Sequence, residues 1–334
     1  MDVALDRLGR PLRDLRISVT DRCNFRCRYC MPREEFGKGH DFLPKNEILT
    51  YEEIRNFVKA CKPLGLRKVR ITGGEPLLRQ DIHHLVRQLS SMEMEVALTT
   101  NGSLLENNAA DLAESGLSRV TISLDAIDQE VHSKITDSKV SVTDILDGIS
   151  AAIRYELGPV KINCVVQRGV NEHQIPKLVR KFRGTGVIVR FIEFMDVGST
   201  NGWTQGQVVP TSEIIDFLSS EFDLIPLGRK SASDVASRWA HSDDSGEIGF
   251  ISSVSQPFCG DCVRARLSSD GKFFTCLFTT TGHDMSALIK SGGKTEVLTQ
   301  SIEEVWSARK DRYSEERPSV AISLPRVEMS YIGG

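Results

Sequence analysis

The chain has 334 residues, 40% hydrophobic and 26% charged, which is enough for a large α/β core or for two ordinary domains. Its formal net charge of −3 excludes a general attraction to nucleic acid or acidic membranes, so any cationic site must be local. The first residues lack an apolar leader, and nowhere do about 18 uncharged apolar residues run together, so we expect a soluble, unexported, cytoplasmic protein.

Six short stretches rich in Val, Ile and Thr predict β-strands. They are residues 12–20, 68–72, 95–100, 119–125, 160–166 and 187–195. Helical patterns lie between most of them, and the repeated strand-then-helix order predicts a parallel sheet wound by right-handed crossovers.

Three of the helical patterns have recognisable ends or faces. Residues 50–65 begin with Thr50 and Glu53 as a capping box and stop at Gly65. In residues 104–116 and 144–155, apolar side chains recur at helical spacing, which predicts one buried face on each helix. These predicted faces consist of Leu105, Ala109, Leu112 and Ala113, and of Ile145, Ile149, Ala152 and Ile153.

The first strand is followed directly by "CNFRCRYC", which spaces Cys23, Cys27 and Cys30 as Cys-x3-Cys-x2-Cys. A structural zinc ion usually takes four ligands, and the nearest histidine, His40, lies downstream in a glycine-containing loop. An iron–sulfur cluster held by three thiolates keeps one iron free to bind another molecule. The spacing therefore favours a reactive cluster, with zinc as the alternative.

The next two strands end in "GGEP" and "TTNG". Gly73 and Gly74 permit close backbone approach, and Pro76 stiffens the position of Glu75. Ordinary turns are the alternative interpretation. Because α/β folds bind ligands at the carboxyl ends of their strands, where the cysteine loop also lies, we expect a binding site there.

Parallel strands covered on both faces are usually apolar throughout, yet these strands alternate. Residues two apart point the same way, so each strand carries a polar face. The polar positions are Arg16, Ser18, Thr20, Arg70, Thr72, Thr99, Asn101, Thr121, Ser123, Asp125, Lys161, Asn163 and Arg190. A sheet with one face exposed to solvent would explain these polar positions. If the sheet instead curls into an open barrel, its cations face a lumen that favours binding of a polyanion.

A second cysteine group, Cys259, Cys262 and Cys276, follows in "FCGDCVRAR" and beyond. A zinc ion with a distant fourth ligand is an alternative to an iron–sulfur cluster here. Arg264 and Arg266 lie two apart and so share one strand face.

The remaining cysteines, Cys61 in a helical run and Cys164 in a strand, are expected to be inert buried thiols.

Taken in order, "CNFRCRYC", "GGEP", "TTNG" and "SLDA" resemble the radical S-adenosylmethionine (SAM) superfamily. The second cysteine group, the two arginines and the terminal "YIGG" are similar to the GTP 3′,8-cyclases of molybdenum cofactor biosynthesis, the MoaA type. The match runs from about Leu12 to Gly334.

This resemblance implies an α/β fold, an incomplete (βα)6 radical SAM barrel closed by a C-terminal segment that carries a second iron–sulfur cluster. Residues 1–225 would form the barrel, and residues 226–334 the second-cluster and substrate region. The implied activity is cyclisation of GTP to (8S)-3′,8-cyclo-7,8-dihydroguanosine 5′-triphosphate. Reductive cleavage of SAM would lead to loss of the C3′ hydrogen, and C3′ would then bond to C8 of the purine.

The resemblance also implies the site residues. Cys23, Cys27 and Cys30 would hold one [4Fe-4S] cluster, and Cys259, Cys262 and Cys276 a second. The implied SAM contacts are Tyr29, Gly74, Glu75, Ser123 and Met195. The implied GTP contacts are Arg16, Arg70, Thr99, Lys161, Arg190, Arg264, Ala265 and Arg266. Gly333 and Gly334 would thread into the barrel as backbone ligands, a frayed tail being the alternative.

The implied partners are a flavodoxin- or ferredoxin-like electron donor, a second copy in a homodimer, and cyclic pyranopterin monophosphate synthase as recipient of the product. No nucleic acid or membrane partner is expected. Two rival functions stay open: a peptide-modifying radical SAM maturase with an auxiliary cluster, and a non-enzymatic iron–sulfur or zinc protein.

The chain departs from the family pattern at three places. Val263 stands where many relatives carry asparagine, residues 135–142 lack an arginine seen in many relatives, and the conformation of residues 194–203 is open.

Overall fold

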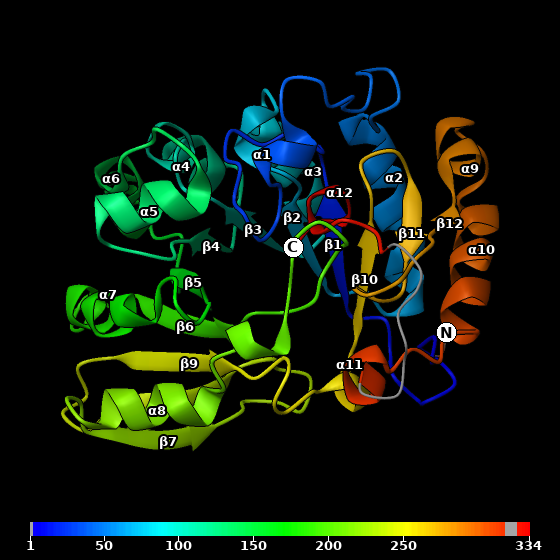
Figure 1. Ribbon diagram of the computed structural model, residues 1–334. Coiled ribbons are helices and arrows are strands. Elements are labelled where there is room, and N and C mark those ends of the chain that lie inside the picture. Colours follow the sequence, from blue (N-terminus) through cyan, green and yellow to red (C-terminus); the bar gives the residue numbers. More distant parts are fainter. Residues whose placement is uncertain (1–2, 318–325) are drawn as a thin grey trace.

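The computed structural model describes residues 3–317 and 326–334 (Figure 1). All six predicted strands are present, and each pairs in parallel with the next along the chain. They are β1 (Asp14–Ser18), β2 (Lys68–Thr72), β3 (Glu95–Thr100), β4 (Arg119–Ser123), β5 (Lys161–Val166) and β6 (Ile188–Glu193). The predicted sheet of six parallel strands is therefore confirmed.

Helices lie between these strands and cover the outside of the sheet (Figure 1). They are α1 (Arg33–Phe36), α2 (Tyr51–Cys61), α3 (Ile82–Ser90), α4 (Leu105–Glu114), α5 (Gln129–Thr136), α6 (Val142–Arg154) and α7 (Ile175–Phe182). Helix α2 begins as predicted, because the Thr50 hydroxyl accepts from the Glu53 amide and the Glu53 carboxylate accepts from the Thr50 amide. Gly65, in the left-handed conformation at φ +108°, ends the short 3-10 turn that follows α2.

The predicted apolar face of α6 is wrong at one position. Ile145, Ile149 and Ala152 are buried, but Ile153 is 45% exposed. At 100° per residue, Ile153 lies about 80° around the helix from Ile145, at the margin of the apolar stripe. It also occupies the last turn of the helix.

Strands from the later part of the chain extend the sheet at both edges. Strand β9 (Glu247–Ile251) pairs in parallel with β6, and β10 (Arg264–Leu267) pairs in parallel with β1. Antiparallel strands complete each side: β8 (Ser237–His241) and β7 (Leu224–Gly228) beyond β9, and β11 (Lys272–Phe274) and β12 (His283–Asp284) beyond β10. Within the described residues the sheet thus has 12 strands.

The later helices are α8 (Thr211–Ser219), α9 (Ser286–Lys290), α10 (Thr295–Ser307), α11 (Tyr313–Glu316) and α12 (Met329–Ile332). They contact mainly the parallel core and its helices: α8 contacts β6 and α7, α9 and α10 contact α2, and α12 contacts β1. Helix α10 packs against α2, so a late helix lies beside an early one (Figure 1). Cys61 and Cys164 are fully buried in the core, which confirms the prediction of buried thiols.

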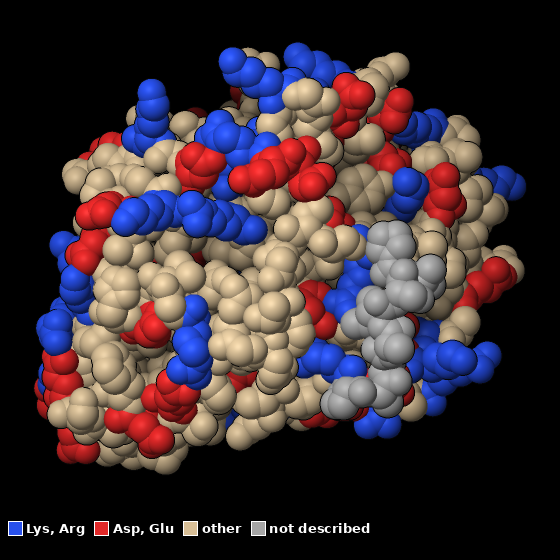
Figure 2. All heavy atoms as spheres, in the orientation of Figure 1, with Lys and Arg blue, Asp and Glu red and all other residues tan. Residues whose placement is uncertain are grey.

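Residues 194–203, whose conformation the sequence leaves open, form a loop that is fixed by side-chain hydrogen bonds. The Asn201 side chain donates to the carbonyls of Met195 and Val197, and the Trp203 indole donates to the Phe194 carbonyl. None of the described helices combines the length and apolar character needed to cross a bilayer. On the face shown in Figure 2, basic and acidic side chains both occur, mainly toward the rim, and neither sign covers the face, in keeping with the small net charge.

Candidate active site

The sheet curves around a cavity of about 810 Å³, and strands from both edges of the six-stranded core line it. Most of the predicted polar positions face this space. Those lining it are Arg16, Arg70, Thr72, Thr99, Asn101, Ser123, Asp125, Lys161, Asn163 and Arg190. The polar faces therefore line a lumen, as the open-barrel interpretation predicts.

Three of the predicted polar positions, Ser18, Thr20 and Thr121, are buried behind the cavity wall. The Thr121 hydroxyl accepts from the Arg70 guanidinium at 3.2 Å, so it orients a residue that does face the lumen. Ser18 donates to the carbonyl of Thr20 and stabilises the turn after β1.

Cys23, Cys27 and Cys30 all face the cavity from the loop after β1. A tight turn, in which the Cys30 amide donates to the Cys27 carbonyl at 2.9 Å, holds two of the thiols together. The amides of Arg26 and Arg28 donate to carbonyls at the end of α5, which fixes the loop over the strand ends.

The pKa values of these thiols are raised. Burial raises the pKa of Cys23 to about 11, and burial together with the neighbouring thiols raises the pKa values of Cys27 and Cys30 further. Three thiolates gathered here repel one another, so their ionised form requires a compensating positive charge. An iron–sulfur core supplies such a charge, and the donor set therefore fits a three-thiolate cluster.

The "GGEP" strand end packs against the cysteine loop. The Gly74 amide donates to the Thr20 carbonyl at 2.7 Å, and a Cβ at Gly74 would lie 2.2 Å from the Arg22 carbonyl oxygen. Glycine at this position is what allows β2 to end directly under the loop that carries the three thiols.

We expect Gly74→Ala to destabilise the protein by about 1–3 kcal/mol, because the added methyl group overlaps backbone that cannot move alone. Gly39→Ala is the matched control, since a Cβ there meets nothing within 4 Å. Thermal unfolding of both variants checks this, and equal stability of the two would contradict the packing argument.

Glu75 does not line the cavity; it is fully buried behind it. Its carboxylate accepts from the Thr100 hydroxyl at 2.7 Å and from the Asn101 amide at 2.7 Å, and so ties "GGEP" to "TTNG". Burial raises the pKa of Glu75 to about 7 despite these hydrogen bonds. Its predicted contact with SAM stays a prediction, and the structure adds a role in joining two strand ends.

The other predicted SAM contacts, Tyr29, Gly74, Ser123 and Met195, all line the cavity. The Tyr29 hydroxyl donates to Asp125 at 2.7 Å, and Asp125 in turn accepts from the Val165 amide at 2.8 Å. The aromatic ring beside the last cysteine is thereby anchored to the ends of β4 and β5.

Cys259, Cys262 and Cys276 face the same cavity. Cys259 is the first residue of a 3-10 turn (Cys259–Asp261), and the Cys262 amide donates to the Cys259 carbonyl at 3.1 Å. Cys262 lies just before β10. Burial raises the pKa of the Cys262 thiol, but the guanidinium groups of Arg264 and Arg309 outweigh it and lower the value to about 6. Both donate to its sulfur at 3.3 Å, which suits a thiolate ligand.

No group of three or more His, Cys, Asp or Glu side chains in residues 3–317 and 326–334 is arranged to hold a single metal ion.

The predicted GTP-binding cations gather across neighbouring strands. Arg16 on β1 lies level with Arg70 on β2 and with Arg266 on β10. Burial, followed by repulsion from Arg266 and Arg70, lowers the pKa of Arg16 well below its ordinary value. Burial and neighbouring arginines likewise lower the pKa of Lys161 to about 8 and that of Arg190 to about 9.

These cations have few partners of their own. Arg70 donates to the Thr99 hydroxyl at 3.1 Å, and the Nε atoms of Arg16 and Arg190 are buried without a hydrogen-bond partner among the described residues. Asp14 offsets part of the charge of Arg16 and Arg70, but buried guanidinium nitrogens without hydrogen-bond partners are costly, so the cavity suits a ligand with several negative charges. Ala265 differs from its predicted companions, because its side chain lies fully buried in the core.

The Gly333–Gly334 pair lies in the cavity region. Arg266 donates to the Gly333 carbonyl, and Gly334 lines the cavity. A Cβ at Gly333, where φ is +77°, would lie 2.3 Å from the Thr72 methyl group. The pair is thus packed against the barrel wall, and its assistance to catalysis stays a prediction.

Sequence reasoning missed several cavity residues. Lys230 and Arg238, from the β7–β8 hairpin, and Arg119, at the start of β4, also line the cavity. His132 lines it too, with both ring nitrogens buried and unpartnered among the described residues. Lone charges and histidines carry no local signal, because only the curvature of the sheet brings them to the lumen.

A curved parallel sheet with three thiols in the loop after its first strand defines the radical SAM class of proteins. Family models agree: the radical SAM superfamily matches residues 17–182, and Molybdenum Cofactor Synthesis C matches residues 187–315. The fold also resembles the crystal structure of Streptococcus suis SuiB bound to S-adenosylmethionine, with a TM-score of 0.60, 15% identity, and coverage of 88% of this chain and 68% of that one.

The sequences of curated relatives identify one family within this class. The chain is 46% identical to a GTP 3′,8-cyclase of Acidothermus cellulolyticus, over 98% of each chain. It is 45% identical to a GTP 3′,8-cyclase of Staphylococcus epidermidis, over 100% of this chain and 99% of that one. The chain belongs to the GTP 3′,8-cyclase family. The predicted resemblance is confirmed, and family membership implies use of SAM and an iron–sulfur cluster.

Proposed function

We propose that this enzyme cyclises GTP to (8S)-3′,8-cyclo-7,8-dihydroguanosine 5′-triphosphate, the first step of molybdenum cofactor biosynthesis, within the cavity described above. One observation carries the proposal: two sets of three thiols line the same cavity as a group of buried cations, some of whose guanidinium nitrogens lack hydrogen-bond partners among the described residues. Family membership and the relatives' names support the same activity.

We assign one [4Fe-4S] cluster to Cys23, Cys27 and Cys30 and a second to Cys259, Cys262 and Cys276. Three protein ligands leave one iron of each cluster open, for SAM at the first and for the purine of GTP at the second. When bound, the first cluster and SAM supply the means of removing a hydrogen atom from C3′ of GTP.

The chain's own residues hold and orient the reactants. Tyr29, Gly74, Ser123 and Met195 form the SAM pocket, with Glu75 accepting from the SAM amino group in our proposal. The triphosphate lies against the cations, whose guanidinium forks match phosphate oxygens. The proposed GTP contacts are Arg16, Arg70, Thr99, Lys161, Arg190, Arg264, Ala265 and Arg266. The barrel wall excludes water from the reacting carbon atoms.

A peptide-modifying activity is the main rival. A structure of Streptococcus suis SuiB is bound to a precursor peptide, but that likeness, at 15% identity, extends to the fold alone. A set of buried cations favours a small polyanion over a neutral peptide backbone.

The proposal is tested by anaerobic incubation of the reconstituted protein with SAM, dithionite and one nucleotide at a time, followed by mass analysis. We expect 5′-deoxyadenosine and a cyclised product of the mass of GTP when GTP is supplied. Equal product formation from ATP, or SAM cleavage with no nucleotide product, would contradict the proposal.

Lys161 gives this binding a pH dependence. Burial and Arg190 lower its pKa to about 8, so it is charged below that pH and loses its charge above it. A bound triphosphate favours the charged form. We therefore expect GTP affinity to be constant below about pH 7.5 and to fall by up to about tenfold per unit above about pH 8. Calorimetry between about pH 7 and 9 measures it; Lys161→Met should bind more weakly and lose this dependence, and an unchanged slope in that variant would assign the titration elsewhere.

Several further points complete the proposal. We propose that residues 1–225 form the barrel unit and residues 226–334 the second-cluster and substrate unit, a boundary that falls within β7. We also propose a cytoplasmic location, a homodimer, a flavodoxin- or ferredoxin-like electron donor, and transfer of the product to cyclic pyranopterin monophosphate synthase.

A further inference from the structure

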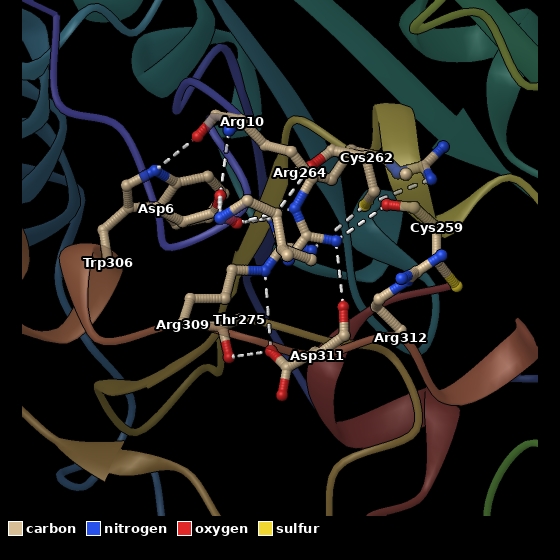
Figure 3. Close-up of polar contacts among 12 residues, drawn as sticks. Asp6, Arg10, Cys259, Cys262, Arg264, Thr275, Trp306, Arg309, Asp311 and Arg312 are labelled. Atoms are coloured by element: carbon tan, nitrogen blue, oxygen red, sulfur yellow. Dashed lines mark hydrogen bonds and ion pairs between the residues drawn. The ribbon is translucent and has the colours of Figure 1, made fainter. Parts of the chain in front are cut away.

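Beside the second cysteine set lies a largely buried polar network made from two segments far apart in the sequence, and two of its members, Arg309 and Asp311, also line the cavity. One segment contains Asp6 and Arg10, before β1; the other contains Trp306, Arg309 and Asp311, around the end of α10. Figure 3 shows these side chains converging on the turn that carries Cys259 and Cys262. The GTP and SAM contacts proposed above do not include any of them.

Arg309 contacts a predicted cluster ligand directly. Its guanidinium donates to the Cys262 carbonyl at 2.8 Å and to the Cys262 sulfur at 3.3 Å. The residue is 4% exposed, and its guanidinium carbon lies 4.6 Å from the centre of the Trp306 ring. A cation held on an aromatic face and forked onto one cysteine has little freedom to turn away.

Asp6 supplies the counter-charge. One carboxylate oxygen lies 2.6 Å from Nε of Arg10 and 3.6 Å from Nη1 of Arg309. The other oxygen accepts from the amides of Leu8 and Arg10, both at 2.9 Å. An asparagine at this position would keep the acceptor for the amides and lose the negative charge.

The same network reaches the other two cysteines through the backbone. Arg10 donates to the Cys259 carbonyl at 2.7 Å and to the Asp311 carbonyl at 2.9 Å. The hydroxyl of Thr275, which precedes Cys276 in the chain, donates to the Asp311 carboxylate at 2.6 Å. All three cysteines are therefore tied to one scaffold.

We propose that Arg309 is a positioning residue for the second iron–sulfur cluster: it aims the Cys262 thiolate at the cavity and stabilises the reduced cluster, while Asp6 limits that stabilisation. The inference rests on the proposed function, because it requires iron at Cys259, Cys262 and Cys276. A hydrogen bond and a positive charge at a ligand sulfur favour the state with more negative charge and so raise the reduction potential. A nearby carboxylate has the opposite effect.

The test measures the potential of the second cluster in the full-length Cys27→Ser protein, in which the first cluster is disabled. We expect Arg309→Gln to shift the potential to a more negative value and to speed iron loss to a chelator about tenfold or more. Arg309→Lys, which keeps the charge without the fork, should lie between Arg309→Gln and the parent. Asp6→Asn should shift the potential the opposite way, to a more positive value. Arg180→Gln, at an exposed arginine paired with Glu221, is the matched control and should change neither quantity.

Arg309→Gln and Asp6→Asn are expected to shift the reduction potential in opposite directions. The comparison therefore separates an effect on the potential of the cluster from a general loss of folding. Shifts in the same direction for Arg309→Gln and Asp6→Asn, or parental potentials and iron-loss rates in both, would overturn the inference. If Arg309→Gln does not fold, Arg309→Lys and Asp6→Asn carry the same comparison. A parent protein without iron at the second set would instead contradict the two-cluster proposal, so the two failures are distinguishable.

Discussion

Cys27→Ser is expected to abolish SAM cleavage and to lower the iron content from about eight to about four atoms per chain. The reason is geometric: the three thiols of the first loop face the cavity together, and removing one leaves two anchors for a cluster whose fourth corner must stay open. Iron and sulfide analysis after anaerobic reconstitution, together with chromatography for 5′-deoxyadenosine, measures both effects.

Cys61→Ser is the matched control for this variant. It makes the same change of sulfur to oxygen at a thiol that is fully buried in the core, away from both cysteine sets. The control should keep both clusters and SAM cleavage. If Cys27→Ser retains cleavage, or if the wild-type chain holds four irons and one zinc, the assignment of the clusters fails.

Arg266→Ala is expected to weaken GTP binding by about 2–3 kcal/mol, which corresponds to about 30- to 150-fold in affinity. Arg266 is 5% exposed, lies level with Arg16 across the sheet, and faces the cavity. Its loss removes a buried charge-assisted contact with phosphate. SAM cleavage should continue without GTP turnover, because the first cysteine set is untouched.

Equilibrium binding of GTP and the ratio of 5′-deoxyadenosine to cyclised nucleotide measure this uncoupling. Arg180→Ala, which removes an exposed arginine paired with Glu221, is the control and should bind GTP and couple the two products as the wild-type protein does. Arg266 also donates to the Gly333 carbonyl, so Arg266→Lys is included to separate loss of charge from loss of that contact. Wild-type GTP affinity in Arg266→Ala would remove this arginine from the substrate site.

Much of this fold could be predicted from local patterns. The six strands of the parallel core alternate polar and apolar residues with period two, and the α2 capping box lies in four consecutive residues. The cysteine spacing and the glycine pair are also local signals, and the structure brings them to one cavity.

The added strands could not be predicted in the same way. Strands β10 and β11 have four and three residues; β10 is placed by pairing with β1, far earlier in the chain, and β11 by pairing with β10. The prediction for Ile153 failed because helical periodicity alone does not show how wide the buried face is or whether it extends into the last turn.

The roles of buried side chains were the hardest to predict. The sequence indicates Glu75 as a ligand contact, and only the structure shows its carboxylate joining two strand ends. Arg10 meets Cys259 across 249 positions of sequence, and Arg309 meets Cys262 across 47. No local motif marks such contacts, since they exist only once the sheet edges and α10 have come together.

The central claim is that SAM and GTP meet in this cavity, with C3′ of the ribose as the reacting atom. The most direct measurement uses GTP carrying deuterium at C3′ in an anaerobic reaction with SAM and dithionite, followed by mass spectrometry of the 5′-deoxyadenosine formed. The account predicts one deuterium transferred to 5′-deoxyadenosine in step with formation of the cyclised nucleotide. Unlabelled 5′-deoxyadenosine accompanied by a fully labelled nucleotide would contradict it.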